Sequence, residues 1–338
     1  MCLLLLRRKA TEETPACYAP TCLLDIPDPC LLTVLQHVAA THQRSLFSAA
    51  RSHSMLYSLA SVAQRDIVAV FNNRWTAQQQ MDSVLEYMRK YSPHIDSVAL
   101  RSCPNVRDDT HLWGLPSNLQ LSSLHLENLR LDELDWSLCS MLDNPAAAAA
   151  FKQLRLSNCE LCSVHSYANH MDKALLQLPA WLEHLSFDSL TSGSDGVDHK
   201  GRQLRADSAC FHTDKLLRLQ QLTYLELASI DVKSSDDTNL ALQPLQALTC
   251  LVHLRLARVV SDDAIRARDL AEVVPSNTHE VMLTASMLSG AEHLTHLDFS
   301  GNVQPGVLAG KTQLQFLSMR ACTVSGRAAG VVQLLSHM

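Results

Sequence analysis

The sequence predicts an α/β solenoid, in which short parallel strands stack on a concave face and helices or turns form the convex face, preceded by a small all-helical segment. Three observations lead to this fold class. A short apolar motif recurs through residues 94–338, its copies start 20 to 43 residues apart, and the first ninety residues lack it and instead place apolar residues at helical spacing. Because periods of about 20–50 residues are typical of stacked architectures, the periodicity decides the fold.

The recurring motif is an apolar residue, two of any type, an apolar residue, one of any type, and a third apolar residue. Its complete copies begin at Phe151 and Leu314, and each continues to a cysteine, as Phe151 does to Cys159. They match the leucine-rich-repeat consensus. Shorter copies begin at Ile95, Leu121, Leu182, Leu222, Leu251 and Leu294.

Each copy predicts one strand with an apolar and an outward side. Alternation places Leu154 and Leu156 in the interior of the stack and Gln153 and Arg155 on the concave face. The first outward column is Ser123, Gln153, His184, Tyr224, His253, His296 and Phe316. The second is His125, Arg155, Ser186, Glu226, Arg255, Asp298 and Ser318.

The aromatic, histidine and charged members of these columns are the candidate target-binding residues, since aromatic and arginine side chains are the usual anchors of protein interfaces. They are Arg155, His184, Tyr224, Glu226, His253, Arg255, His296, Asp298 and Phe316. An exposed Phe316 beside His296 is the expected hot spot. The alternative is a column that is covered by a loop or only loosely solvated.

The segments between the strands predict helical turns at 174–178 and 242–248 and a helix within 132–142. Insertions are expected near 189–213, which is rich in Ser, Gly and Asp and predicts a loop, and near 258–278. Residues 68–93 predict a linking or capping helix, because Thr76 and Gln79 form a capping-box pattern ahead of apolar residues at helical spacing.

The N-terminal part predicts a flexible stretch over 1–21 and a helical segment over 22–67. Asp28 and Pro29 suit the start of a helix whose apolar stripe is formed by Leu31, Leu32, Leu35 and Val38. Such a short helical unit buries little surface alone, so we expect it to dock on another surface.

Residues 22–67 resemble the F-box. The resemblance rests on Ile26-Pro27-Asp28, on Leu31-Leu32 and Val34-Leu35, and on the stretch from Ser45 to His53; Arg51 stands where that family has a cysteine, and Met55 or Leu56 where it has a tryptophan. It implies that the segment binds the Skp adaptor of a cullin–RING ubiquitin ligase, while the repeats select the target protein. By the same resemblance, the adaptor-binding residues are Pro27, Leu31, Leu32, Leu35, Leu46 and Ala50.

Two other functions stay open. The same leucines could pack as an N-terminal cap of a repeat scaffold without a ubiquitin role, for instance in cytoskeletal or ciliary assembly. A small-molecule sensor is a third, although no residue points to it.

Composition excludes several classes of protein. The net charge is -6 and no long basic run occurs, so we expect no nucleic-acid partner. No apolar stretch approaches the ~20 residues of a membrane span, and eleven cysteines follow no disulfide framework. A soluble protein of the cytoplasm or nucleus, or both, fits best.

The sequence contains one spacing typical of a metal site and no catalytic motif. Cys159, Cys162 and His165, with His170 after them, have the spacing of a zinc site, but Cys159 occupies an inward repeat position where a thiol packs as a small apolar group. No nucleophile elbow, phosphate loop or dinucleotide-binding motif occurs. We therefore expect a non-enzymatic adaptor without metal or cofactor.

Overall fold

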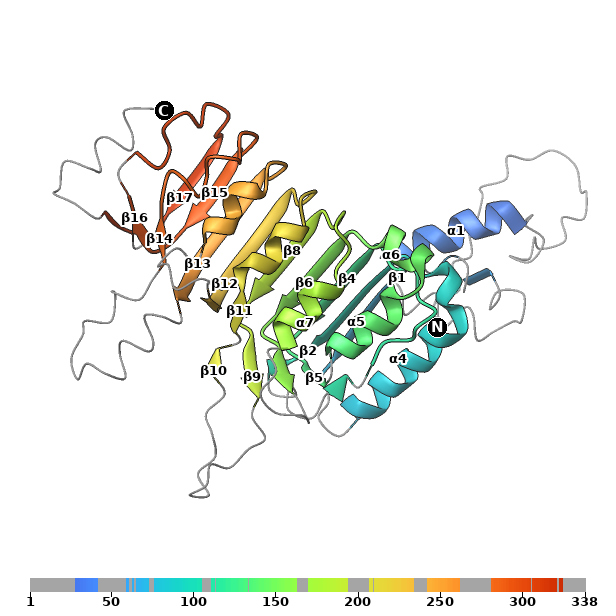
Figure 1. Ribbon diagram of the computed structural model, residues 1–338. Helices are drawn as coiled ribbons and strands as arrows, with labels where there is room; N and C mark the ends of the chain where they lie inside the picture. The colour runs from blue at the N-terminus through green and yellow to red at the C-terminus, as the bar shows by residue number, and fades with distance from the viewer. Residues whose placement is uncertain are drawn as a thin grey trace, which may run out of the picture. The chain divides into compact units, whose positions relative to one another are not determined.

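The computed structural model divides into two compact units, Met1–Ala63 and Gln64–Met338 (Figure 1). The residues that it describes are 28–41, 59–60, 63, 65–72, 76–104, 111–112, 114–132, 134–162, 170–193, 207–208, 210–233, 242–261, 281–304, 306–320 and 322–324. Within them, no helix is both long enough and apolar enough to pass through a bilayer.

The first unit contains the predicted helix, α1 (Asp28–Thr41). Leu31 and Leu35, one helical turn apart, are buried together with Ala60 and Ala63. Leu32, Val38 and Leu59 pack against this cluster. The apolar stripe read from the sequence is therefore the core of a small helical unit.

The second unit is a parallel sheet with helices over one face (Figure 1). The sheet runs in the order β1 (Asp66–Phe71), β2 (Ser97–Ser102), β4 (Ser123–Glu127), β6 (Gln153–Ser157), β8 (His184–Asp188), β12 (Tyr224–Lys233), β13 (His253–Ser261), β15 (His296–Phe299) and β17 (Phe316–Met319), with β11 (Cys210–His212) beside β12. All eight predicted strands are confirmed, and each starts two residues after its motif begins.

Two shorter ladders run along the edge where the strands end. One contains β3 (His111–Leu112), β5 (Arg130–Asp132), β7 (Glu160–Cys162), β9 (Thr191–Gly193) and β10 (Asp207–Ser208); the other contains β14 (Met282–Leu283), β16 (Asn302–Val303) and β18 (Thr323–Val324). Neighbouring coils thus pair a second time where a short ladder is present, as the coils of β4 and β6 do through β5 and β7, which confirms the leucine-rich-repeat solenoid.

The chain turns between the two ladders at a left-handed residue. Asn128, Asn158, Ser189, Ser229 and Arg258 all have φ between 49° and 54°. The amide of Asn158 donates to the carbonyl of Asp188 at 2.8 Å, and that of Ser189 to Ala228 at 2.8 Å. A corner therefore also carries a hydrogen bond to the next coil.

The other face of the main sheet is covered by helices and single turns. They are α4 (Ala77–Tyr91), η2 (Ser92–His94), α5 (Leu134–Leu142), α6 (Pro145–Ala150), α7 (His170–Gln177), η4 (Thr213–Arg218) and η5 (Gln243–Ala247). The helical turns predicted at 174–178, 242–248 and within 132–142 are confirmed. Between these helices and the sheet lies one continuous core, to which the inward Leu154 and Leu156 belong.

Cys159 lies at the inward position predicted for it. Its thiol is buried and donates to the carbonyls of Leu126 at 3.4 Å and Ser157 at 3.3 Å. His165 lies outside the described residues. The described residues contain no group of ligands that could hold a metal ion.

Four details differ from the sequence predictions. The sheet begins at Asp66, inside the stretches assigned to the helical segment and the linker, where β1 pairs with β2. The sequence did not predict this strand because it lacks the repeat motif. The capping box of α4 does not form: Thr76 has ψ of -1°, and its hydroxyl instead accepts from Gln80 Nε2 at 3.1 Å. The prediction of a loop over 189–213 is wrong at both ends, where β9, β10 and β11 form. Of the second insertion, 258–261 belong to β13, and 262–280 lie outside the described residues.

Candidate target-binding face

The candidate site is the face of the main sheet that carries the outward columns, which we call the open face. The strand register aligns Gln153 with His184, His184 with Tyr224, and Tyr224 with His253. It continues from His253 to His296 and from His296 to Phe316. The second column is aligned in the same way. The placement of both columns is confirmed, whereas binding by them stays a prediction.

Five rings of the first column contact one another in sequence, stacked except for the tilted pair of Tyr224 and His253, and form what we call the ring ladder: His184, Tyr224, His253, His296 and Phe316. The His184 and Tyr224 rings lie 3.9 Å apart and nearly parallel, and those of His253 and His296 lie 4.1 Å apart. Tyr224 and His253, and then His296 and Phe316, are each separated by 5.8 Å. Parallel strands repeat at about 4.8 Å, so equivalent side chains fall naturally at stacking distance.

The ring ladder is half-buried except at its last member. Phe316 is 49% exposed, although it is a large apolar side chain. An exposed aromatic ring that continues a row of rings offers apolar area that a partner could cover.

Beside the ladder, a polar network surrounds Glu226, which is only 2% exposed. Its carboxylate accepts from Ser186 Oγ at 2.7 Å and from the Tyr224 hydroxyl at 3.1 Å, and it forms an ion pair with Arg255. Arg255 Nε also lies 3.4 Å from Asp298 Oδ2. Burial opposes ionisation of Glu226, but these hydrogen bonds and Arg255 outweigh it and hold its pKa below the usual range.

Burial also sets the charge of the ladder. It lowers the pKa of His184, with Arg155 adding to the effect, and it lowers the pKa of His253, with His296 adding to it. Burial and then the nearby Glu226 carboxylate raise the pKa of Tyr224. At neutral pH the ladder therefore presents uncharged rings at these three positions.

Arg155 lies on β6, one strand before the ladder begins. Its side chain is exposed. Across the described part of the chain, no hydrogen bond or ion pair is made by Arg155, in contrast to Arg255.

The predicted adaptor-binding residues lie in the first unit. Leu31 and Leu35 are buried and Leu32 is half-buried. Pro27, Leu46 and Ala50 lie outside the described residues. On α1, Val34 is a large apolar side chain that is 46% exposed.

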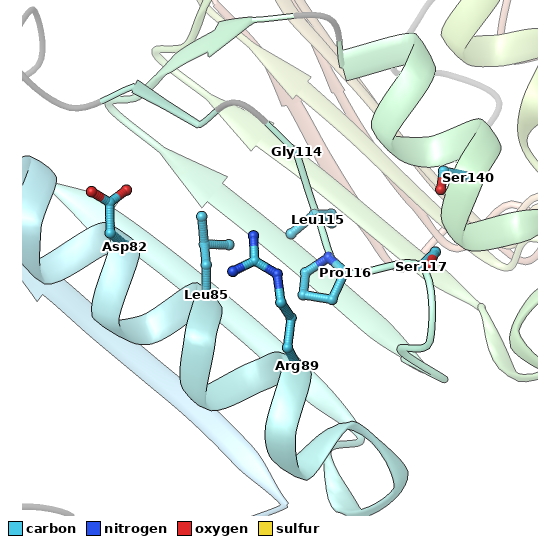
Figure 2. Close-up of a pocket in the computed structure, with 8 residues that line it drawn as sticks. All are labelled: Asp82, Leu85, Arg89, Gly114, Leu115, Pro116, Ser117 and Ser140. Atoms are coloured by element: carbon cyan, nitrogen blue, oxygen red, sulfur yellow. The ribbon is translucent and has the colours of Figure 1, made fainter.

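Two surfaces were not singled out by the sequence. Val68 and Val70 of β1 are exposed on its outward side, and the continuous apolar run 67–71 gives no sequence sign of which side each residue takes. A pocket of about 360 Å³ lies between α4, the segment 114–117 and α5. Figure 2 shows Arg89 reaching from α4 toward Leu115 and Pro116, with Ser140 beyond them. Among the described residues, no hydrogen bond or ion pair joins two side chains of this pocket.

No protein-family model matches the chain. No curated protein matches it either. Among solved structures, it is similar to an internalin from Listeria monocytogenes at 12% identity, over 73% of this chain and 76% of the internalin chain, with a TM-score of 0.27.

Proposed function

We propose that the open face is a protein-recognition surface and that the chain acts as a non-catalytic adaptor. The observation that carries the proposal is the ring ladder, which ends at the exposed Phe316 beside a polar network that is already satisfied internally. Binding of a partner would bury the apolar surface of the rings, which favours association. The Glu226 carboxylate already has its hydrogen bonds, so it needs none from the partner.

The proposal is tested by replacing Phe316 with a photo-crosslinking amino acid and capturing partners from cell extract. We expect a defined protein to be cross-linked at this position and not at Trp181, an exposed aromatic residue that follows α7. Phe316→Ser should weaken binding of the captured protein by about thirtyfold, as expected of a hot spot. Equal cross-linking at both positions, or binding unchanged by Phe316→Ser, contradicts the proposal.

The resemblance of residues 22–67 to the F-box extends the proposal to a substrate receptor of a cullin–RING ubiquitin ligase, working in the cytoplasm or nucleus. Support comes from the sequence match at Ile26-Pro27-Asp28, and from Val34, which is exposed on α1. The buried Leu31 and Leu35 would then hold the shape of the helical unit instead of contacting the adaptor.

The extension is tested by pull-down of a purified Skp-type adaptor with the full chain. Val34→Asp should abolish capture, whereas Gln36→Asp, an equally acidic change at an exposed position of α1, should leave it intact. If the wild-type chain fails to retain the adaptor while target capture through Phe316 persists, the repeat scaffold without a ubiquitin role is correct.

A further inference from the structure

The charges of the open face are mostly neutralised within the face itself. Glu127 Oε2 lies 3.4 Å from Arg101 Nε. Glu226 and Asp298 share Arg255. Asp188 accepts from Ser189 Oγ at 2.9 Å. A partner therefore meets few acidic groups that lack a counter-charge or a donor.

Arg155 is the exception among the basic residues of this face. It is exposed and makes no hydrogen bond or ion pair within the described residues, yet its charge acts on histidines of both neighbouring strands, β4 and β8. It lowers the pKa of His184 and of His125 after the larger effect of burial. Because the lowered pKa values keep His125 and His184 neutral at neutral pH, the positive charge at this point is carried by the Arg155 guanidinium. Its N–H groups remain able to donate hydrogen bonds to a partner.

We propose that the target is an extended protein segment that places a carboxylate on Arg155 and apolar side chains along the ring ladder as far as Phe316. This rests on the proposed recognition role of the open face and names the chemistry of its partner. An arginine binds a carboxylate through two parallel hydrogen bonds, and the low polarity of the adjoining rings strengthens that pair.

The strand order sets the length of such a segment. From β6 to β17 the sheet advances through β8, β12, β13 and β15, which is five strand spacings. At about 4.8 Å for each spacing this is about 24 Å, or about seven residues of extended chain. A carboxylate and an apolar side chain about seven residues apart would engage both ends of the face at once.

The probes are fluorescein-labelled peptide pools about eight residues long, blocked at both termini, with one end residue fixed and the rest drawn from Leu, Phe and Ser. Pools with Glu, Gln or Lys fixed at the first or at the last position are titrated with the full chain by fluorescence anisotropy. We expect wild type to bind one of the Glu pools roughly tenfold more tightly than the matching Lys pool, with Gln between them.

Arg155→Glu should reverse this order, because the fixed charge on the face changes sign. Arg89→Glu makes the same change of charge on α4, away from the open face, and should keep the wild-type order. Both positions are exposed, so unchanged thermal unfolding checks that the variants fold.

The inference is overturned if wild type does not distinguish the Glu and Lys pools, if no pool binds, or if Arg155→Glu keeps the wild-type order. In each case the recognition role is judged separately: it stands if Phe316→Ser still weakens binding of the captured protein, and it fails if that variant has no effect.

Discussion

At the scale of single residues, Glu226 is the side chain of the open face whose loss should destabilise the fold most. Its carboxylate satisfies Ser186, whose side chain is 0% exposed, and also Tyr224 and Arg255. A buried hydroxyl without an acceptor is costly, because it has given up water and gained nothing in return.

We therefore expect Glu226→Ala to lower the free energy of unfolding by about 3 kcal/mol in urea denaturation. Glu127→Ala, which removes the part-exposed partner of Arg101, should cost less than about 1 kcal/mol. Equal losses in the two variants would show that the polar network around Glu226 adds no stability.

The histidines of the open face predict how stability depends on pH. The pKa values of His125, His184 and His253 all lie below the ordinary value of 6.5, chiefly through burial. Below that value the unfolded chain binds more protons than the folded chain, so stability falls as the pH falls from about 6.5 toward the folded pKa values. Glu226 acts in the same direction, but only below its ordinary value of 4.5.

Denaturation curves at about pH 7.5 and about pH 5.5 should accordingly give a smaller free energy of unfolding at the lower pH. The double variant His184→Gln, His253→Gln should show a smaller difference between the two conditions than wild type does. A wild-type chain that is equally or more stable at the lower pH rules out this role for the half-buried imidazoles.

At the scale of the elements, the left-handed corners decide how each coil turns. Asn158 has φ of 51° and an exposed side chain, so its backbone conformation matters more than its contacts. Asparagine tolerates this region, whereas a β-branched residue does not.

Asn158→Val should therefore destabilise the fold by about 1–2 kcal/mol, and Asn158→Gly should leave stability nearly unchanged or raise it slightly. Thermal unfolding of the two variants measures the difference. If both variants unfold at the wild-type temperature, the corner is free to adopt another conformation.

The strands and columns were predictable from the sequence because the repeat motif fixes both the start of each strand and the side on which each residue lies. Tyr224, for example, aligns with His184 and His253 as the motif implies. β1 was missed because Asp66–Phe71 is short and lacks the motif, so pairing with β2 is the only sign of its role.

The contacts within the site were less predictable. The sequence placed Ser186 and Glu226 in one column, but it did not reveal that Ser186 would be buried and hydrogen-bonded to that carboxylate. Likewise, the sequence does not distinguish Arg255, which pairs with Glu226 and Asp298, from Arg155, which forms no ion pair within the described residues. Such differences depend on side-chain conformation and not on strand register.

At the scale of the whole repeat unit, stability comes from each coil covering its neighbours. Leu225 lies in β12, between β8 and β13, and is fully buried. Leu317 lies in β17, the last strand of the sheet order, and is only partly buried. The energy of a stacked array is approximately a sum of repeats and interfaces, so the two positions contribute unequally.

Leu225→Ala should cost about 2–5 kcal/mol, and Leu317→Ala distinctly less. Hydrogen exchange should also show β17 opening more readily than β12, because local opening needs fewer contacts to break at the end of the array. If the two substitutions lower the free energy of unfolding equally, the contribution of a leucine does not depend on its position in the stack.

The near-parallel rings of His184 and Tyr224 also provide a spectroscopic reporter. An imidazole held 3.9 Å above a phenol ring lies in the magnetic shielding region of that ring, so its carbon-bound protons should resonate upfield of ordinary histidine protons in NMR spectra. Binding of a molecule to the ring ladder would shift those signals. Protonation of His184 would also shift them if it moved the two rings apart. The occupancy of the face could then be followed in solution without attaching a label.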